Sequence, residues 1–253
     1  MIKIPVFITV RQMSSRLSNK CFKQFGSKSN VIEWVYSRVC SHSQLMPIIC
    51  TGNKEKNEEI INFATKNNIQ YFSGPENNKV KRWFMCAKHF NFEKFHTLDC
   101  DDPFFDPERI IESMEMLNID DTEIILPSDY SDNGAATEGF SIKTDSLKFT
   151  SKLEDSADTE MCYSYLSENL KAKIISDPDY QIKNIRLTLD YEEDYNFLLY
   201  LSSIFDLDIK RRSIETFIKE NYEETPNFSC NELWKNNQNS ITKETYENFS
   251  RTK

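Results

Sequence analysis

The chain has 253 residues, enough for one large α/β domain or two small ones. Its 40 acidic and 31 basic residues give a formal net charge of −9, which argues against nucleic acid as the main partner, because a phosphate backbone selects basic surfaces. Its seven cysteines form no C-x-x-C pair, so we expect reduced thiols in a cytoplasmic protein, without a disulfide scaffold or a zinc site.

Short apolar runs alternate with amphipathic stretches over most of the chain. The first run, MIKIPVFITV, is too short for a signal peptide or a membrane span and predicts a buried strand. The predicted strands are residues 4–10, 47–51, 69–72, 95–99, 123–127 and 184–190. The predicted helices are residues 31–41, 56–67, 77–90, 107–118 and 191–204. This alternation predicts an α/β fold with a Rossmann-like, doubly wound and mostly parallel central sheet.

The composition changes near residue 225, where the chain becomes polar and rich in asparagine. We expect residues 1–224 to form the main domain. Residues 225–253 are predicted to be a polar tail that packs on this domain or on a partner subunit, with Trp234 as its one large anchor.

A cationic loop follows the first predicted strand. In open α/β sheets, ligands bind beyond the carboxyl ends of the strands, so this loop is a candidate site. Its sequence, VRQMSSRLSNK, carries Arg11, Arg16 and Lys20 among hydroxyl and amide side chains. Such cations can neutralise several phosphate oxygens, but they could equally form a solvated loop that balances nearby carboxylates. The spacing is not that of a P-loop.

A second candidate site is the acidic segment TLDCDDPFFDPE, residues 97–108. Asp99, Asp101 and Asp102 follow a predicted strand, and like charges this close repel unless a cation or a proton intervenes. Mg²⁺ typically takes one or two protein carboxylates, and Asp101 is the candidate ligand. In an extended stretch, Asp99 and Asp101 would point to the same side. Asp106 is expected to cap the following helix.

The third candidate is RLTLDYEED, in which a predicted strand ends at Asp190. Asp190 and Glu193 have the spacing of a D-x-x-E variant of the capping box at the start of a helix. Asp190 is equally a candidate for a second metal contact. The two roles are compatible, because a carboxylate has two oxygens.

These three loops, in this order, resemble bacterial cytidylyltransferases that make CMP-activated acidic sugars, the CMP-ulosonate and CMP-sialate synthetase group. The nearest pattern is that of the branch named for spore coat polysaccharide biosynthesis protein F. Its first loop reads approximately Ala-Arg-x-Gly-Ser-x-Arg-Leu-Pro-Gly-Lys, and this chain keeps both arginines, the first serine, the leucine and the lysine. FSGPENNKVKRW, residues 72–83, is similar to Gly-Ser-Glu-Asp-Asp-Val-Leu-x-Arg-Tyr and keeps Gly74, Glu76 and Arg82.

The resemblance extends to the two acidic segments. CDDPFFDPE is similar to Gly-Asp-x-Pro-Leu-Ile-Asp-Pro-Glu, with Cys100 in place of the glycine. RLTLDYEED is similar to Arg-Leu-Thr-Val-Asp-Thr-Pro-Glu-Asp. Asp101 and Asp190 therefore correspond to the two metal-side aspartates of the family.

The segments that correspond to the acceptor-binding region of this family match its motifs less well. GAATEGF, residues 134–140, is similar to Gly-Leu-Asp-x-Glu-x-Phe and keeps Glu138, but Ala136 replaces the aspartate. DTEMCYSYL is similar to Arg-Glu-His-Val-Thr and keeps Glu160, but Met161 replaces the histidine. The whole resemblance covers roughly residues 4–205.

The resemblance implies the nucleotide-diphospho-sugar transferase fold and a cytoplasmic enzyme of surface polysaccharide biosynthesis. The enzyme would join CMP from CTP to a small acidic sugar or similar acid and release pyrophosphate, with Mg²⁺ as cofactor and with no nucleic acid or membrane as partner. A homodimer is compatible with this family. The implied catalytic residues are Lys20, Arg11 and Asp101. The implied nucleotide-binding residues are Arg11, Ser14, Ser15, Arg16, Lys20 and Arg82, the acceptor-binding residues are Glu138 and Glu160, and the metal ligands are Asp101 and Asp190.

Two alternatives stay open at this point. Asp99-Cys100-Asp101 is an Asp-x-Asp, the short motif with which nucleotide-sugar glycosyltransferases hold a metal and a nucleotide diphosphate. The chain could also be a non-catalytic relative that kept the CTP pocket, because Met13 and Cys100 stand where the family has glycines and Met161 where it has histidine.

Overall fold

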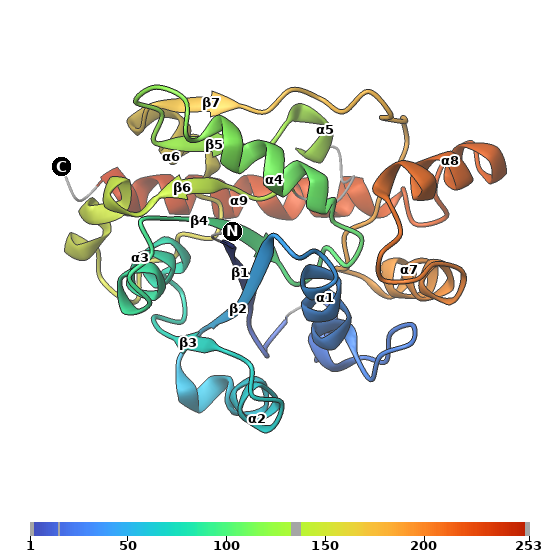
Figure 1. The fold of residues 1–253 in the computed structure, drawn as a ribbon, viewed down its shortest axis with the longest axis horizontal. Coiled ribbons are helices and arrows are strands. Elements are labelled where there is room, and N and C mark those ends of the chain that lie inside the picture. Colours follow the sequence, from blue (N-terminus) through green and yellow to red (C-terminus); the bar gives the residue numbers. More distant parts are fainter. Residues whose placement is uncertain (1–2, 15, 133–137, 251–253) are drawn as a thin grey trace.

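The computed structural model describes residues 3–14, 16–132 and 138–250 of the chain. A seven-stranded sheet runs through the centre with strand order β3-β2-β1-β4-β6-β5-β7 (Figure 1). The strands are β1 (Ile4–Val10), β2 (Leu45–Thr51), β3 (Tyr71–Ser73), β4 (Lys94–Asp99), β5 (Ile124–Leu126), β6 (Ser141–Lys143) and β7 (Ala172–Ile174). Strand β6 runs antiparallel to β4 and β5, and the other pairings are parallel. The predicted α/β class with a mostly parallel sheet is confirmed.

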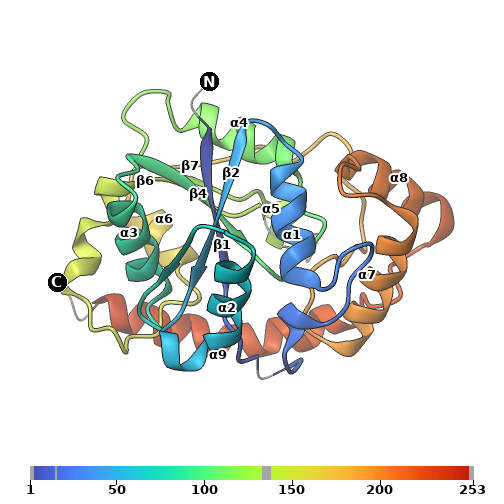
Figure 2. The same ribbon diagram turned by 60° about the horizontal axis from the view of Figure 1, so that its bottom comes forward.

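Helices cover both faces of the sheet (Figures 1 and 2). They are α1 (Val31–Cys40), α2 (Glu58–Lys66), α3 (Lys79–His89), α4 (Pro107–Met116), α5 (Asp129–Asp132), α6 (Tyr163–Asn169), α7 (Glu192–Ile204), α8 (Arg211–Asn221) and α9 (Cys230–Ser250). Three 3-10 helices, η1 (Lys20–Phe22), η2 (Lys54–Lys56) and η3 (Thr144–Lys152), lie between them.

The alternation of side chains along β1 divides the core into two main layers. Val6, Ile8 and Val10 pack with buried residues of α1, α2, α7 and α8 on one face. Phe7 points to the other face, where it stacks on Phe95 at 4.4 Å and packs with residues of α3 and α6. Because both faces of β1 are covered, its seven residues are almost uniformly apolar, as expected for a central parallel strand.

One predicted strand is wrong. Residues 184–190 belong to no strand of the sheet, and Asn184 at their start has φ of 57°, in the left-handed region. Ile185, Leu187 and Leu189 alternate as in a strand because they are buried against the α7–α8 layer. The segment is joined to the loop after β4, where the Leu189 amide donates to the Asp101 carbonyl at 2.7 Å. The places beyond β4 are taken by β6, β5 and β7.

Local capping explains where the helices begin. Asp106 accepts a hydrogen bond from the amide of Glu108 at 3.0 Å, and Pro107 occupies the first turn of α4, so the predicted cap is confirmed. Asn78 caps α3 in the same way by accepting from the amide of Lys81. The capped start of α3 matters below, because its first residue reaches the candidate site.

The C-terminal part of the described chain contains a 21-residue helix, α9, drawn as the long red ribbon in Figure 2. Phe249 near its end is fully buried and stacks on Tyr165 of α6 with a centroid distance of 4.1 Å. Trp234, the expected anchor, is only half-buried. Among the helices of residues 3–14, 16–132 and 138–250, none combines the length and apolar character needed to span a membrane.

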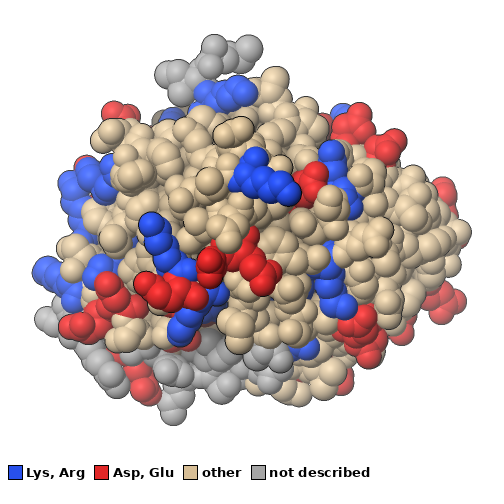
Figure 3. Space-filling model, turned by 90° about the horizontal axis from the view of Figure 1, so that it is seen from below, with Lys and Arg blue, Asp and Glu red and all other residues tan. Residues whose placement is uncertain are grey.

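The surface carries charges of both signs. Figure 3 shows one face on which lysines and arginines stand beside aspartates and glutamates. Several other lysines and arginines lie at the carboxyl edge of the sheet, where they pair with carboxylates, as described next.

Candidate active site

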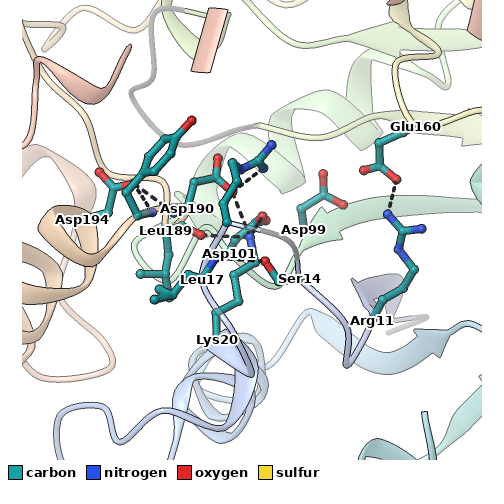
Figure 4. A network of polar contacts seen from close by, with 12 residues as sticks. Arg11, Ser14, Leu17, Lys20, Asp99, Asp101, Glu160, Leu189, Asp190 and Asp194 are labelled. Carbon is teal, nitrogen blue, oxygen red and sulfur yellow. Dashed lines mark hydrogen bonds and ion pairs between the residues drawn. The ribbon is translucent and has the colours of Figure 1, made fainter. Parts of the chain in front are cut away.

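The loop after β1 brings Lys20 against carboxylates from two distant segments (Figure 4). The Lys20 ammonium donates to Asp101 Oδ2 at 2.5 Å, to the Leu189 carbonyl at 2.9 Å and to Asp190 Oδ1 at 3.0 Å. These contacts use all three of its donors. Burial on its own would lower the pKa of Lys20, but Asp101 and Asp190 outweigh it and raise the pKa above its ordinary value. Lys20 is therefore a fixed cation at any physiological pH.

The residue before Lys20 shows how this loop turns. Asn19 has φ of 54°, in the left-handed region that asparagine tolerates better than most residues. The resembled family motif has glycine at this place, the residue for which that conformation carries no steric penalty. Asparagine therefore preserves the turn that delivers the lysine.

Asp190 is the buried member of this group, with its side chain 2% exposed. Arg16 donates to its Oδ1 at 2.6 Å, and the Arg186 guanidinium lies 3.6 Å from its Oδ2. Burial would raise the pKa of Asp190, but Lys20 and Arg16 hold it below its usual range. We call Arg16, Lys20, Asp101 and Asp190 the first ion group.

The backbone of Asp190 is held by a neighbouring carboxylate. Asp194, in the first turn of α7, accepts from the amides of Asp190 and Tyr191 at 2.9 and 3.0 Å. Its two oxygens also accept from Arg186 at 2.8 and 2.9 Å. The predicted cap by Asp190 and Glu193 is therefore wrong: Asp194 caps this helix, and the Asp190 side chain is left to face Arg16 and Lys20.

A second ion group lies beside the first. Arg11 donates to Glu160 Oε2 at 3.1 Å, and the Lys79 ammonium contacts Glu160 Oε1 at 3.2 Å and Asp99 Oδ2 at 3.0 Å. Burial would raise the pKa of Glu160, but Lys79 and Arg11 lower it to about 2. We call Arg11, Lys79, Asp99 and Glu160 the second ion group. Figure 4 shows Asp99 between Asp101 and the Arg11–Glu160 pair.

Lys79 was not among the residues predicted from the sequence. A signal was present, because a lysine in the first turn of a helix faces the positive end of the helix dipole and needs nearby carboxylates. The expectation that Asp99 and Asp101 share an extended geometry is also wrong. β4 ends at Asp99, the chain turns at Cys100 and Asp101, and the two aspartates bind different lysines.

The other predicted residues lie as follows. Arg82 is fully buried and donates to the carbonyls of Pro75 and Glu76 at 2.6 and 2.9 Å, so it supports the loop before α3 instead of pointing at either ion group. The hydroxyl of Ser14 accepts from the Leu17 amide at 3.5 Å within the cationic loop. Ser15 lies outside the described residues.

Glu138 belongs to neither ion group. It accepts from Arg109 Nε at 2.6 Å and from the amide of Ser128 at 2.7 Å, just before β6. Ala136, its neighbour in the resembled motif, lies outside the described residues. The structure thus brings Lys20, Asp101, Asp190, Arg16, Arg11 and Glu160 to one region, and it holds the Arg82 and Glu138 side chains in other contacts.

A cavity of about 360 Å³ lies elsewhere, and no member of the two ion groups lines it. Its walls are Gly26, Ser27, Leu199, Ser202, Ser203, Ile204, Phe205 and Asp206. Hydroxyl and apolar side chains dominate this lining, with a single carboxylate. The concentration of charged groups therefore makes the carboxyl edge of the sheet the better candidate for chemistry.

Comparisons with known proteins bear on the fold of the chain. No protein-family model and no curated protein matches the chain. A cytidylyltransferase structure from Leptospira borgpetersenii is 23% identical with a TM-score of 0.74, covering 87% of this chain and 95% of that one. A CMP:2-keto-3-deoxy-manno-octonic acid synthetase complexed with CTP is 13% identical with a TM-score of 0.58, covering 80% and 99%. Rv0371C of Mycobacterium tuberculosis, in complex with manganese, is 10% identical with a TM-score of 0.53, covering 79% and 99%.

The chain has a nucleotidyltransferase fold. At these identities the likeness concerns the fold, which is shared with a structure described as a nucleotide-diphospho-sugar transferase. The fold class implied by the sequence resemblance is thus confirmed.

The first ion group fits a divalent metal that arrives with phosphate. The Lys20 ammonium contacts both Asp101 Oδ2 and Asp190 Oδ1. These two oxygens therefore lie no further apart than the sum of the two contact distances. Two carboxylates match the number that Mg²⁺ usually takes from a protein, with phosphate oxygens and water completing its shell. Within the part of the chain that is described, no group of three or more His, Cys, Asp or Glu side chains forms a metal site.

An unpaired donor in the same group also fits an anion. Arg16 Nε is buried and has no hydrogen-bond partner among the described residues. Buried polar atoms are normally paired, so each exception calls for an explanation. A phosphate oxygen bound in the cationic loop would satisfy this donor.

Proposed function

We propose that this protein is a Mg²⁺-dependent cytidylyltransferase that joins CMP to a hydroxyl group of an acidic sugar or similar acid. The substrates would be CTP and the acid, pyrophosphate would leave, and the product would serve surface polysaccharide biosynthesis in the cytoplasm. The observation that carries the proposal is the position of Lys20 between Asp101 and Asp190. The cytidylyltransferase and the CTP complex that share the fold support it.

Arg11, Arg16 and Lys20 would bind the triphosphate. In the structure, each of them is paired with a carboxylate, so the loop carries little uncompensated charge. CTP and its metal ion bring charges of both signs. The cations can then exchange carboxylates for phosphate oxygens while the two aspartates are neutralised in turn. We therefore expect nucleotide and metal to bind together more strongly than either alone.

Asp101 and Asp190 would hold the metal ion. When bound, Mg²⁺ would supply Lewis-acid activation of the attacking hydroxyl and charge neutralisation at the α-phosphate. The Asp101 side chain is 25% exposed whereas Asp190 is 2% exposed, so Asp101 is the carboxylate that can face the acceptor. Asp190 is fixed from behind by the contacts of Asp194 with its backbone.

The cations would also stabilise the transition state. As the bond from the α-phosphorus to pyrophosphate breaks, negative charge grows on the departing oxygens, and a donor fixed beforehand lowers the barrier. Removal of one such donor typically costs about 2.7–4 kcal/mol, or roughly 10²–10³ in rate. Lys20 is the best-positioned candidate because it lies between the two carboxylates that would hold the metal ion.

Glu160 and Glu138 are the proposed acceptor residues. The Glu160 side chain is partly exposed and ionised, so it can accept a hydrogen bond from an acceptor hydroxyl while it orients Arg11. Glu138 precedes β6, which pairs with the strand that ends at Asp99. A role for Glu138 would involve its partner Arg109, whose guanidinium could contact the carboxylate of an acid.

The test is to incubate the full-length protein with each of the four NTPs, Mg²⁺ and a panel of sugar acids, and to follow pyrophosphate. The proposal predicts release with CTP and an acid, and at least hundredfold slower release for Lys20→Ala and Asp101→Asn. Unchanged turnover in both variants would show that the residue assignments are wrong. CTP binding without turnover on any acceptor would favour the non-catalytic alternative.

The glycosyltransferase alternative needs both aspartates of Asp99-Cys100-Asp101 near the metal. Asp99 pairs with Lys79 and Asp101 with Lys20, so the two carboxylates are not gathered on one cation, which disfavours this alternative. The same assay separates the two activities, because a glycosyltransferase would release UDP or GDP and no pyrophosphate.

A further inference from the structure

We propose that Arg211 of α8 is a positioning residue that fixes the loop carrying Asp101, and that Glu215 and Tyr130 orient it for this task. The inference rests on the proposed function in taking Asp101 as a metal ligand. α8 follows the part of the chain that resembles the cytidylyltransferase motifs, so the resemblance gives Arg211 and Glu215 no role.

The loop after β4 is held by side chains from two helices. Three consecutive carbonyls, those of residues 103–105, each accept hydrogen bonds from a buried side chain. The first accepts from Trp34 at 3.0 Å and the last from Arg38 at 3.0 and 3.2 Å, both of which lie in α1. The middle carbonyl, that of Phe104, accepts from Arg211 at 2.9 Å. α8 therefore supplies the contact at the centre of this loop.

The backbone connects these contacts to Asp101. Two turns follow one another here, because the Asp102 amide donates to the Asp99 carbonyl and the Phe105 amide donates to the Asp102 carbonyl, both at 3.1 Å. The Asp101 carbonyl is itself bonded by the Leu189 amide at 2.7 Å. A loop bonded at so many points moves as a unit. A shift of its held carbonyls would therefore displace the Asp101 carboxylate.

Arg211 is oriented by a buried chain of hydrogen bonds. Its side chain is 5% exposed, and its Nε donates to Glu215 Oε1 at 2.8 Å, one helical turn later. Glu215 is 1% exposed and accepts from the Tyr130 hydroxyl through its other oxygen. The Tyr130 hydroxyl oxygen in turn accepts from the Ile182 amide at 3.1 Å. The direction in which Arg211 meets the loop therefore depends on Glu215 and Tyr130.

A gain in stability does not account for this pair. Burial raises the pKa of Glu215 even though Arg211 opposes the shift, so ionisation of Glu215 carries a cost here. Replacement of a buried ion pair by apolar residues of similar volume is often neutral or stabilising. Apolar residues, however, could not donate to the Phe104 carbonyl from a fixed direction. The role that remains for the pair is to hold the loop in one position.

The same chain of bonds reaches a second loop of the carboxyl edge. Tyr130 lies in α5, and the residues on either side of it bond Glu138. The Ser128 amide donates to Glu138 Oε2 at 2.7 Å, and the Glu138 amide donates to the Ser131 hydroxyl at 2.9 Å. The chain from Arg211 through Tyr130 thus fixes the loop after β4 relative to α5, which separate apolar contacts to each would not do.

The experiment measures CTP binding to the full-length protein by isothermal titration, in Mg²⁺ and again in EDTA. Arg211→Met is compared with wild type, with Arg211→Lys, which keeps a donor for the Phe104 carbonyl, and with Arg212→Met. Arg212 is the matched control, because its loss removes the same charge from the same helix. Its side chain is 59% exposed and pairs with the exposed Asp179, away from the loop after β4.

A positioning role affects the part of the binding that needs the metal. Changes to residues that support metal ligands typically cost about 10–100-fold in metal affinity, so we expect CTP binding in Mg²⁺ to weaken about tenfold in Arg211→Met. Binding in EDTA should stay as in wild type. Arg211→Lys should retain most of the affinity and Arg212→Met all of it. General damage to the fold would instead weaken binding in both media.

Tyr130→Phe tests the buried chain with a smaller change. It removes one hydroxyl donor to Glu215, so we expect about threefold weaker CTP binding in Mg²⁺ and no change in EDTA. In the Arg211→Met background it should have no further effect, because Tyr130 acts through Arg211.

Three results would overturn the inference. They are an Arg211→Met protein that binds CTP in Mg²⁺ like wild type, one that loses affinity equally in Mg²⁺ and in EDTA, and an Arg212→Met protein that is equally impaired. If Arg211→Met does not fold, Tyr130→Phe decides the question, and unchanged CTP binding in that variant overturns the inference. Absence of CTP binding in wild type would remove the proposed function and the inference together, whereas normal binding in wild type and Arg211→Met alike would remove the inference alone.

Discussion

Substitution of Lys20 by methionine is the perturbation with the largest expected effect on activity. The change keeps a long side chain but removes an ammonium that contacts two carboxylates and one carbonyl. Removing one partner of a buried ion pair typically costs about 3–5 kcal/mol. Asp190 keeps Arg16 and Arg186, and Asp101 is partly exposed and can be hydrated. We therefore expect a smaller loss in the free energy of unfolding, about 1–3 kcal/mol.

This loss is measurable by thermal unfolding. For a chain of this size, about 1 kcal/mol corresponds to a fall of roughly 2–4 °C in Tm. The expected loss of activity is larger, roughly 10²–10³ in pyrophosphate release, because the same ammonium would stabilise the leaving group. Stability and activity should therefore separate, with most of the folded protein retained at 25 °C and most of the turnover lost.

Lys23→Met is the matched control. Lys23 lies three residues further along and pairs with Glu192 at 3.1 Å, but Glu192 is largely exposed. Surface pairs contribute about 0–1 kcal/mol, so Tm and turnover should change little. A Lys20→Met protein that melts and turns over like wild type, or a Lys23→Met protein that is equally impaired, would refute the reasoning.

Two further predictions concern carboxylates held in ion pairs. The pKa of Glu160 is lowered to about 2 from its ordinary value of 4.5, so its ion pairs with Lys79 and Arg11 stabilise the protein above pH 4.5 and this contribution is lost as the pH falls toward 2. Glu160→Gln should therefore show a shallower loss of unfolding free energy than wild type between pH 4.5 and 2, measured by urea unfolding; equal slopes would contradict the assignment. Asp194→Asn should cost about 3–5 kcal/mol, because it breaks a fully buried pair with Arg186 that also anchors the backbone of Asp190. Thermal unfolding checks this, and a Tm equal to that of wild type would show that Asp194 is not an essential anchor.

The central strands and most of the helices could be predicted from the sequence because each has a strong local pattern. β1 is a continuous apolar run, and α4 begins with an aspartate cap followed by proline. β6 and β7 have three residues each, which is too short for any periodicity to be recognised. Residues 184–190 show the opposite problem, since their alternation is real but results from packing on α7 and α8.

Part of the candidate site could be predicted from charged residues that lie just after predicted strands. Lys20 and Asp101 lie in the loops after β1 and β4, so their convergence follows from the sheet rule, whereas Asp190 reaches the same region from a segment that joins no strand of the sheet. The pairing of cations with carboxylates could not be predicted, because it depends on turns such as the one at Cys100 and Asp101, which separates two aspartates that an extended chain would align. Arg82 shows the same limit: its spacing fits a motif, but burial turns its guanidinium toward backbone carbonyls.

The central claim is that cations of the first loop and two carboxylates form one site for a nucleoside triphosphate with its metal. Isothermal titration of CTP into wild-type protein tests it most directly, in Mg²⁺ and again in EDTA, with Lys20→Met as the comparison. The account predicts one CTP per chain in Mg²⁺, with at least tenfold weaker binding in EDTA and in Lys20→Met. Absence of CTP binding, or equal affinity in Mg²⁺, in EDTA and in the variant, would contradict it.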